Sequence, residues 1–294
     1  MHTMIDGGAE ATVRRRWLRS GGALVAIVAL LAAAACGDDD SDTTAAEDAD
    51  DSADADEAAG SDTDLDAYCE AVLALEMAPP PDIDFATATP EEIAAGLQAH
   101  AADTMRPLAD EVLAVAPDEL ADDLDAMDGA LTELEATGDI AVFDQPEAAE
   151  ASDRLHSFDL DNCGWTTTDI TATNYAFDGI PDELPTGVTS FEMTNDGTDV
   201  HEFVLFRKND GVTQSAEDLL ALPPEEALQQ VTQVGFQDLV SPGDASYSVV
   251  DLAAGDYVAV CFLPVGMTSE QEPPPADAPP HFTHGMFAEF TVSA

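Results

Sequence analysis

Basic residues are scarce in this chain of 294 residues, which has 8 lysines and arginines against 61 aspartates and glutamates. Four of the eight, Arg14, Arg15, Arg16 and Arg19, lie close to the N-terminus. Nucleic acid is excluded as a partner, because binding it requires clustered lysine and arginine. An electrostatic hold on an anionic membrane is disfavoured for the same reason. Solvation and salt tolerance explain the acidic composition best, although such a surface can also steer a cationic partner.

Long apolar runs are also lacking, with one exception near the N-terminus. Uncharged residues run from Gly21 to Ala35, and Cys36 follows. About 15 residues are short for a membrane-spanning helix, which needs roughly 20, so we predict an export signal peptide over residues 1–35. The alanines before Cys36, with Leu31 upstream, resemble a bacterial lipobox, and this implies that Cys36 is lipidated. An uncleaved signal anchor is the alternative, and the export route, Sec or twin-arginine, is left open.

Aromatic residues are absent from the next segment. Between Gly37 and Asp64 the chain consists of Asp, Ala, Ser, Thr, Glu and Gly. Such a segment cannot bury enough apolar area to offset the entropy lost on ordering, and its like charges repel. Residues 36–64 are therefore predicted to be a lipidated cysteine and a disordered acidic tether. The remainder of the chain is expected outside the cytoplasm, anchored to the cell membrane.

Cysteines are few, and each of the four has a predicted role. Disulfides persist in an exported protein, and lipidation of Cys36 leaves three thiols to assign. Cys69 begins the first helical pattern and Cys163 follows the last one, so we predict a disulfide between them. Closing a loop of 94 residues should contribute about 4 kcal/mol of stability. Cys261 is left unpaired, which is a liability unless it is buried or bound.

Helical patterns fill residues 65–165. Thr89-Pro90-Glu91-Glu92 has the form of a capping box with proline at the first helical position. One helical face is formed by Leu120, Leu124, Met127, Leu131 and Leu134. Helices are expected at about 65–76, 90–115, 118–138 and 146–157, and they form an antiparallel bundle closed by the disulfide. His100 and His156 lack the spacing of metal ligands, so the bundle gives no indication of function.

Short strands separated by turns follow Trp165. The expected strands are 168–177, 187–194, 201–207, 246–252, 255–262 and 286–292, with a helical excursion over 215–231. Residues 166–294 are therefore predicted to be an all-β sandwich or barrel.

Four residues of this β region have the order and types of a mononuclear blue-copper site, namely His201, Cys261, His281 and Met286. Such a site needs two imidazoles and a thiolate, with a weak axial thioether. Cys261 ends one expected strand and Met286 opens another, so one loop can present both together with His281. Taken singly, the histidines could be surface residues, Cys261 an inert buried thiol and Met286 a core residue. His284 competes with His281 for the site.

The segments around these residues resemble the cupredoxins, and specifically the plastocyanin-like proteins. The resemblance is carried by Ala172-Thr173-Asn174-Tyr175-Ala176-Phe177, Asn195-x-Gly197-x-x-x-His201-Glu202-Phe203, Gly255-Asp256-Tyr257-Val258-Ala259-Val260-Cys261 and His281-Phe282-Thr283-His284-Gly285-Met286. It covers about residues 166–294 and implies a Greek-key sandwich holding one type 1 copper ion. The chain departs from the family in one respect: Cys261 and His281 are 20 positions apart, with a proline-rich insertion, Glu272–Pro280, between them.

The sequence therefore predicts a membrane-tethered lipoprotein that carries single electrons to or from a redox partner protein, which could be cationic. No enzymatic activity is expected. An alternative is a binding lipoprotein, either copper-free or copper-delivering, in which the helical module recruits a partner. An oxidase fragment is a weaker alternative, because a single mononuclear site argues against it.

Overall fold

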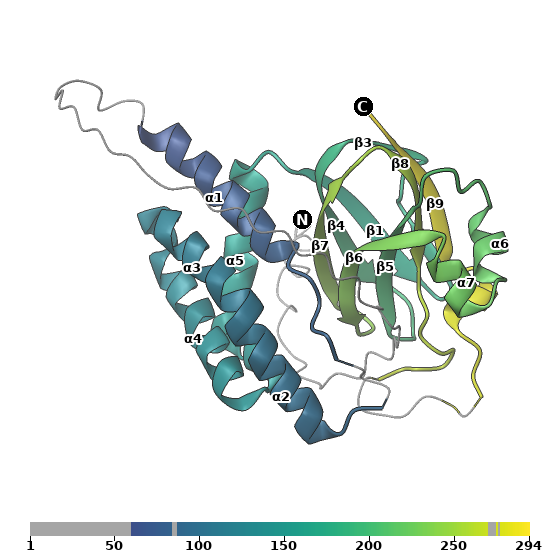
Figure 1. The fold of residues 1–294 in the computed structure, drawn as a ribbon, viewed down its shortest axis with the longest axis horizontal. Coiled ribbons are helices and arrows are strands. Elements are labelled where there is room, and N and C mark those ends of the chain that lie inside the picture. Colours follow the sequence, from purple (N-terminus) through teal and green to yellow (C-terminus); the bar gives the residue numbers. More distant parts are fainter. Residues whose placement is uncertain (1–59, 84–86, 270–274, 276) are drawn as a thin grey trace, which may run out of the picture.

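The computed structural model describes residues 60–83, 87–269, 275 and 277–294, which form a helical domain beside a β domain (Figure 1). The predicted fold class, a disulfide-closed helical bundle followed by an all-β sandwich, is confirmed. The expected signal peptide, Cys36 and most of the expected tether lie outside the described residues. Among the helices of the described part, none is long and apolar enough to cross a membrane.

The bundle consists of α1 (Gly60–Glu76), α2 (Pro90–His100), α3 (Arg106–Val115), α4 (Ala121–Thr137) and α5 (Pro146–Asn162). Short turns η2 (Asp118–Leu120) and η3 (Ile140–Asp144) precede the last two. Helix α1 begins at Gly60, five residues before the expected start at residue 65. The helix expected over 90–115 is helical throughout, but its middle, η1 (Ala101–Met105), is π-helical and separates α2 from α3. Pro107 lies two residues after the end of this segment, and the wider turn fits its missing N–H and its bulky ring.

The predicted disulfide between Cys69 and Cys163 is present, with 5.4 Å between the two Cα atoms. It joins α1 to the residue that ends α5. Beside it, the buried Tyr68 hydroxyl donates a hydrogen bond of 2.9 Å to Asp159. The disulfide therefore joins the first helix to the end of the last helix, next to a buried tyrosine whose hydroxyl is hydrogen-bonded.

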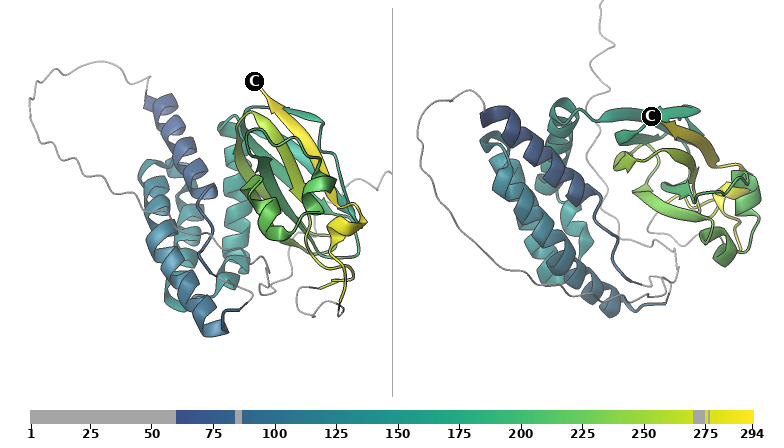
Figure 2. Two further views of the ribbon diagram at one scale, coloured as in Figure 1. Left: turned by 45° about the vertical axis from the view of Figure 1, so that its right-hand side comes forward. Right: turned by 45° about the horizontal axis from the view of Figure 1, so that its top comes forward.

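The β domain has two sheets, in the orders β2-β1-β4-β7 and β3-β9-β8-β5-β6. The strands are β1 (Thr166–Thr173), β2 (Ala176–Asp178), β3 (Glu183–Pro185), β4 (Gly187–Asn195), β5 (His201–Lys208), β6 (Val231–Val240), β7 (Ala245–Leu252), β8 (Gly255–Val260) and β9 (Phe287–Ser293). The pairs β1 with β4 and β3 with β9 are parallel. Two short helices, α6 (Ala216–Leu220) and α7 (Pro224–Leu228), lie on the side away from the bundle (Figures 1 and 2).

Two strand predictions need correction, and the three-residue strand β3 was not predicted either. The single strand expected over 168–177 is broken into β1 and β2, because Tyr175 adopts a left-handed backbone conformation with φ 72°. Strand β6 was not predicted, and the helical excursion ends before it, at Leu228 rather than residue 231. This strand lies at the edge of its sheet, paired with β5, and its polar residues weaken the alternation expected of a strand.

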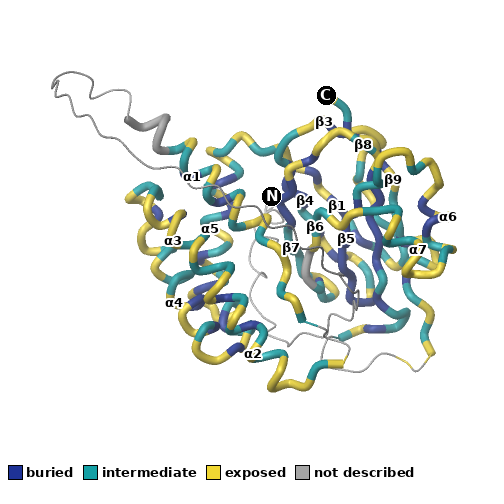
Figure 3. The backbone as a smooth tube through the Cα atoms, in the orientation of Figure 1, coloured by how far each residue is buried: buried dark blue, intermediate teal, exposed yellow. Residues whose placement is uncertain are grey.

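The sandwich core fills the space between the two sheets, and many residues of their strands are buried (Figure 3). Phe191 and Phe203 face each other from opposite sheets with ring centroids 5.3 Å apart, and Phe290 packs on Phe191 at 6.2 Å. Cys261 and Met286 belong to the same buried cluster. Two of the four expected ligands, Cys261 and Met286, therefore belong to the core of the sandwich.

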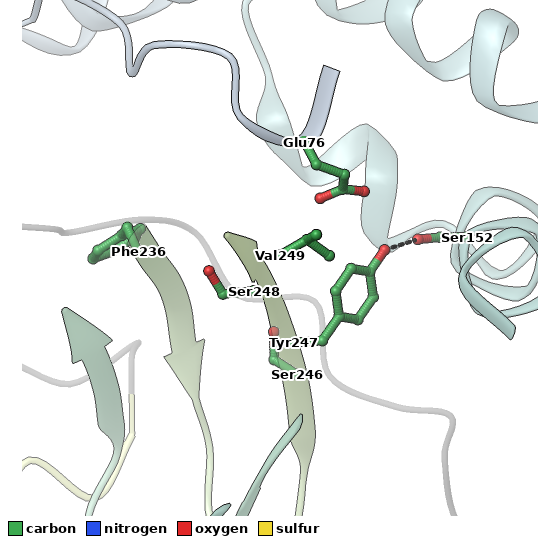
Figure 4. Close-up of a pocket in the computed structure, with 7 residues that line it drawn as sticks. All are labelled: Glu76, Ser152, Phe236, Ser246, Tyr247, Ser248 and Val249. Carbon is green, nitrogen blue, oxygen red and sulfur yellow. Dashed lines mark hydrogen bonds between the residues drawn. The ribbon is translucent and has the colours of Figure 1, made fainter. Parts of the chain in front are cut away.

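The seam between the domains lies on the four-stranded sheet. The ring of His156 in α5 stacks on Tyr247 in β7 with centroids 3.4 Å apart, and its Nε2 atom lies 2.8 Å from a Glu192 carboxylate oxygen. An open pocket of about 330 Å³ lies beside the stack, and its lining includes Glu76 and Tyr247, whose hydroxyl lies 3.5 Å from that of Ser152 (Figure 4). The expected ligands belong to the other sheet, so the bundle docks away from them.

Candidate metal centre

The five-stranded sheet brings the four expected ligands to one end of the sandwich. His201 is the first residue of β5, Cys261 follows the last residue of β8, and Met286 precedes β9. Because β8 pairs antiparallel with both neighbours, its end lies beside the beginnings of β5 and β9. His281 begins a 3-10 turn, η4 (His281–His284), just ahead of Met286.

The side chains of His201, Cys261 and His281 converge in the interior. The Nδ1 atom of His281 lies 3.2 Å from Cys261 Sγ and 3.2 Å from His201 Nδ1. The three residues offer one donor atom each, and these atoms lie within 4.8 Å of one another. All three side chains are fully buried, as is Met286.

A hydrogen-bonded stem brings Cys261 and His281 together despite the 20 positions between them. Pro264 and Pro280 form an antiparallel bridge, and the His281 amide donates to the Leu263 carbonyl at 2.8 Å. The Phe282 amide donates to the carbonyl of Cys261 itself at 3.1 Å. The two arms of the loop are therefore paired next to the ligands. Cys261 and His281 can lie close together although the loop between them is long.

Met286 is tied to both loop ligands through its backbone. Its amide donates to the His281 carbonyl at 3.3 Å, and its carbonyl accepts from the Cys261 amide at 3.2 Å. Gly285 turns the chain just before it with φ 100°, a conformation that favours glycine. The buried thioether of Met286 thus lies at the same end of the core as the donor atoms of His201, Cys261 and His281.

The turn before β5 holds His201 from the other side. The buried Asn195 amide donates to the carbonyls of Asp199 at 2.8 Å and Val240 at 2.7 Å. Its oxygen accepts from the Gly197 amide at 2.8 Å. A Cβ atom on Gly197 would lie 2.8 Å from His201 Nε2, so only glycine permits this approach. The signal in the sequence is the spacing Asn195-x-Gly197 directly before the strand that begins with His201.

Burial sets the protonation of the donors. It lowers the pKa of His201 to about 4, with a further contribution from His281, and it lowers the pKa of His281. Burial also raises the pKa of the Cys261 thiol to about 12, and the nearby Glu202 carboxylate adds to this. At neutral pH the two imidazoles are therefore uncharged and ready to donate lone pairs, whereas the thiol must lose its proton to bind a metal.

This donor set fits a soft cation. Two imidazole nitrogens at 3.2 Å from each other can share at most one proton between them, whereas a cation can accept both lone pairs. The Nε2 atoms of His201 and His281 have no hydrogen-bond partner among the described residues. Two imidazoles, a thiolate and a nearby thioether form the donor combination of blue-copper centres. His284 is exposed and lies against Tyr175, with centroids 4.9 Å apart, outside this group.

Comparisons with known proteins found no matching family model and no matching curated protein. Among solved structures, this chain is similar to a dithionite-reduced auracyanin from Roseiflexus castenholzii, with 22% identity, a TM-score of 0.30, and coverage of 44% of this chain and 98% of that one. It is similar to the blue copper protein auracyanin A from Chloroflexus aurantiacus, with 17% identity, a TM-score of 0.27, and coverage of 44% and 98%. A purple cupredoxin from Nitrosopumilus maritimus has 18% identity, a TM-score of 0.24, and coverage of 44% and 99%.

Proposed function

We propose that this protein is a blue-copper electron carrier in which His201, Cys261, His281 and Met286 hold one copper ion. The observation that supports this most is the convergence of two Nδ1 atoms and one thiol sulfur in a fully buried pocket. Copper would supply a one-electron change between Cu(II) and Cu(I). The protein side chains would supply soft donors, exclude water and hold the ligand geometry fixed.

Burial of the ligands favours electron transfer over catalysis. All four side chains are fully buried, so a substrate cannot reach an open coordination position, as metal-ion catalysis generally requires. An electron needs no such access. The backbone hydrogen bonds that tie Cys261, His281 and Met286 together restrict rearrangement of the site between oxidation states. A redox partner with a cationic surface is proposed, because the net charge of −53 would steer it.

Copper titration of the purified protein tests this function. One equivalent is expected to bind and to produce strong visible absorption when oxidised, which disappears on reduction and returns on reoxidation. The apparent affinity should rise about tenfold per pH unit above neutrality, because binding displaces the Cys261 proton while both imidazoles stay neutral. Uptake of copper without the visible band would favour the copper-delivering alternative, and no uptake would refute the assignment.

We further propose that the protein is tethered outside the cytoplasm by a lipid on Cys36. The support is the order of arginines, apolar run and small residues that precede this cysteine. The variant Cys36→Ala should leave the membrane fraction and appear in the soluble fraction with its visible absorption intact, because the ligands lie more than 160 positions away. Fractionation followed by immunoblotting measures this. A variant that stays with the membrane would show that the apolar run itself is the anchor.

A further inference from the structure

A buried carboxylate, Asp199, lies at the junction of three segments that form the candidate metal centre. It precedes His201 by two positions and is 4% exposed. Its Oδ2 atom accepts a hydrogen bond of 2.6 Å from the Gly266 amide, within the long ligand loop. The Tyr175 hydroxyl lies 3.5 Å from the same oxygen, and the Thr198 hydroxyl donates to Oδ1 at 3.3 Å.

The same Oδ2 atom lies 3.4 Å from Nε2 of His281. This distance is long for a hydrogen bond, but within the described residues Nε2 has no hydrogen-bond partner, and the Asp199 carboxylate lies beside it. A neutral imidazole carries one proton, on either nitrogen. A carboxylate beside Nε2 favours the tautomer protonated there, and this leaves the Nδ1 lone pair directed at Cys261 and His201.

The contact between Asp199 and Gly266 helps to hold the loop between Cys261 and His281, which is long. Gly266 lies on the outgoing arm of the stem, and next to it the Met267 carbonyl accepts from the Val200 amide at 2.6 Å. Asp199 and Val200 thus fasten the loop to the strand that begins with His201. Holding a loop in its binding conformation in advance reduces the entropy lost when a ligand binds.

We propose that Asp199 is a positioning residue for the metal centre, which fixes the metal-binding tautomer of His281 and fastens the ligand loop to the His201 strand. This inference rests on the proposed function insofar as it concerns copper. It goes further by assigning a role to a residue that lies beside Nε2 of His281, whereas the metal-binding atom of this ring is Nδ1. Outer partners of this kind typically change metal affinity by roughly 10- to 100-fold when removed.

The test compares Asp199→Ala with Asp196→Ala, which removes an exposed carboxylate from the same turn. Nitrogen NMR of the metal-free proteins at neutral pH reports which ring nitrogen of His281 carries the proton. We expect Nε2–H in the wild-type protein and in Asp196→Ala, and a mixture of tautomers in Asp199→Ala. Copper affinity should fall roughly 10- to 100-fold in Asp199→Ala alone, with one equivalent still bound.

Asp199→Asn provides a second variant should the alanine variant fail to fold. Its amide oxygen can still accept from Gly266, so the loop stays fastened, but the negative charge beside His281 is gone. A shift toward the Nδ1–H tautomer in this variant supports the proposal. An unchanged tautomer in every folded variant overturns it. Because the tautomer is read without metal, failure of the wild-type protein to take up copper would refute the proposed function and leave this measurement decisive for Asp199.

Discussion

Substitution of Cys261 by serine is expected to abolish the visible absorption of the copper-loaded protein completely. The band of a blue-copper centre arises from charge transfer between thiolate sulfur and Cu(II), and a serine oxygen cannot provide it. Cys261 is the sole free cysteine of the described residues, and its Sγ lies 3.2 Å from His281 Nδ1. Absorption spectroscopy of the oxidised variant, with copper content measured in parallel, checks this result.

Two histidine variants serve as a matched pair for that experiment. His281→Ala removes a buried donor and should lose the colour and most of the copper. His284→Ala removes an exposed imidazole three residues away and should keep both. Colour that persists in Cys261→Ser would contradict thiolate ligation. Loss of copper in His284→Ala with retention in His281→Ala would show that the wrong histidine was chosen.

The sequence indicated the convergence of the ligands because strand ends can be recognised. Cys261 directly follows β8 and Met286 directly precedes β9, so the pairing of these two strands brings them together. The stem that closes the 20-position loop could not be predicted. It depends on a bridge between Pro264 and Pro280, and prolines are poor signals of strand pairing because they lack an amide donor. The hydrogen bond between Asp199 and the loop could not be predicted either, since Gly266 is 67 positions away.

Local signals predicted the helices better than the strands. The Thr89 capping box is formed, with the Glu92 amide 3.3 Å from the Thr89 hydroxyl and the Glu92 carboxylate 2.8 Å from the Thr89 amide. By contrast, the left-handed Tyr175 that divides β1 from β2 has no marker, because such a conformation is uncommon for a residue other than glycine. The stacking of His156 on Tyr247 joins segments 91 positions apart, which no local pattern encodes.

The second large effect is expected in the bundle, where the double variant Cys69→Ala/Cys163→Ala should lose about 4 kcal/mol of unfolding free energy. The disulfide closes a loop of 94 residues, and its removal enlarges the conformational freedom of the unfolded chain. Trp165 packs beside the disulfide, in the same cluster as Cys163. Its fluorescence during urea denaturation therefore reports the unfolding of this part of the molecule.

A reductant distinguishes the effect of losing the disulfide on stability from the effect of replacing the two cysteine side chains. It should shift the Trp165 transition of the wild-type protein toward that of the double variant and leave the double variant unchanged. The candidate ligands lie on the sheet that faces away from the bundle, so the double variant should still bind copper and keep its colour in the absence of urea. Equal stability of the two proteins would contradict the entropic account. Loss of colour in a folded double variant would instead show that the bundle supports the metal centre across the seam of His156 and Tyr247.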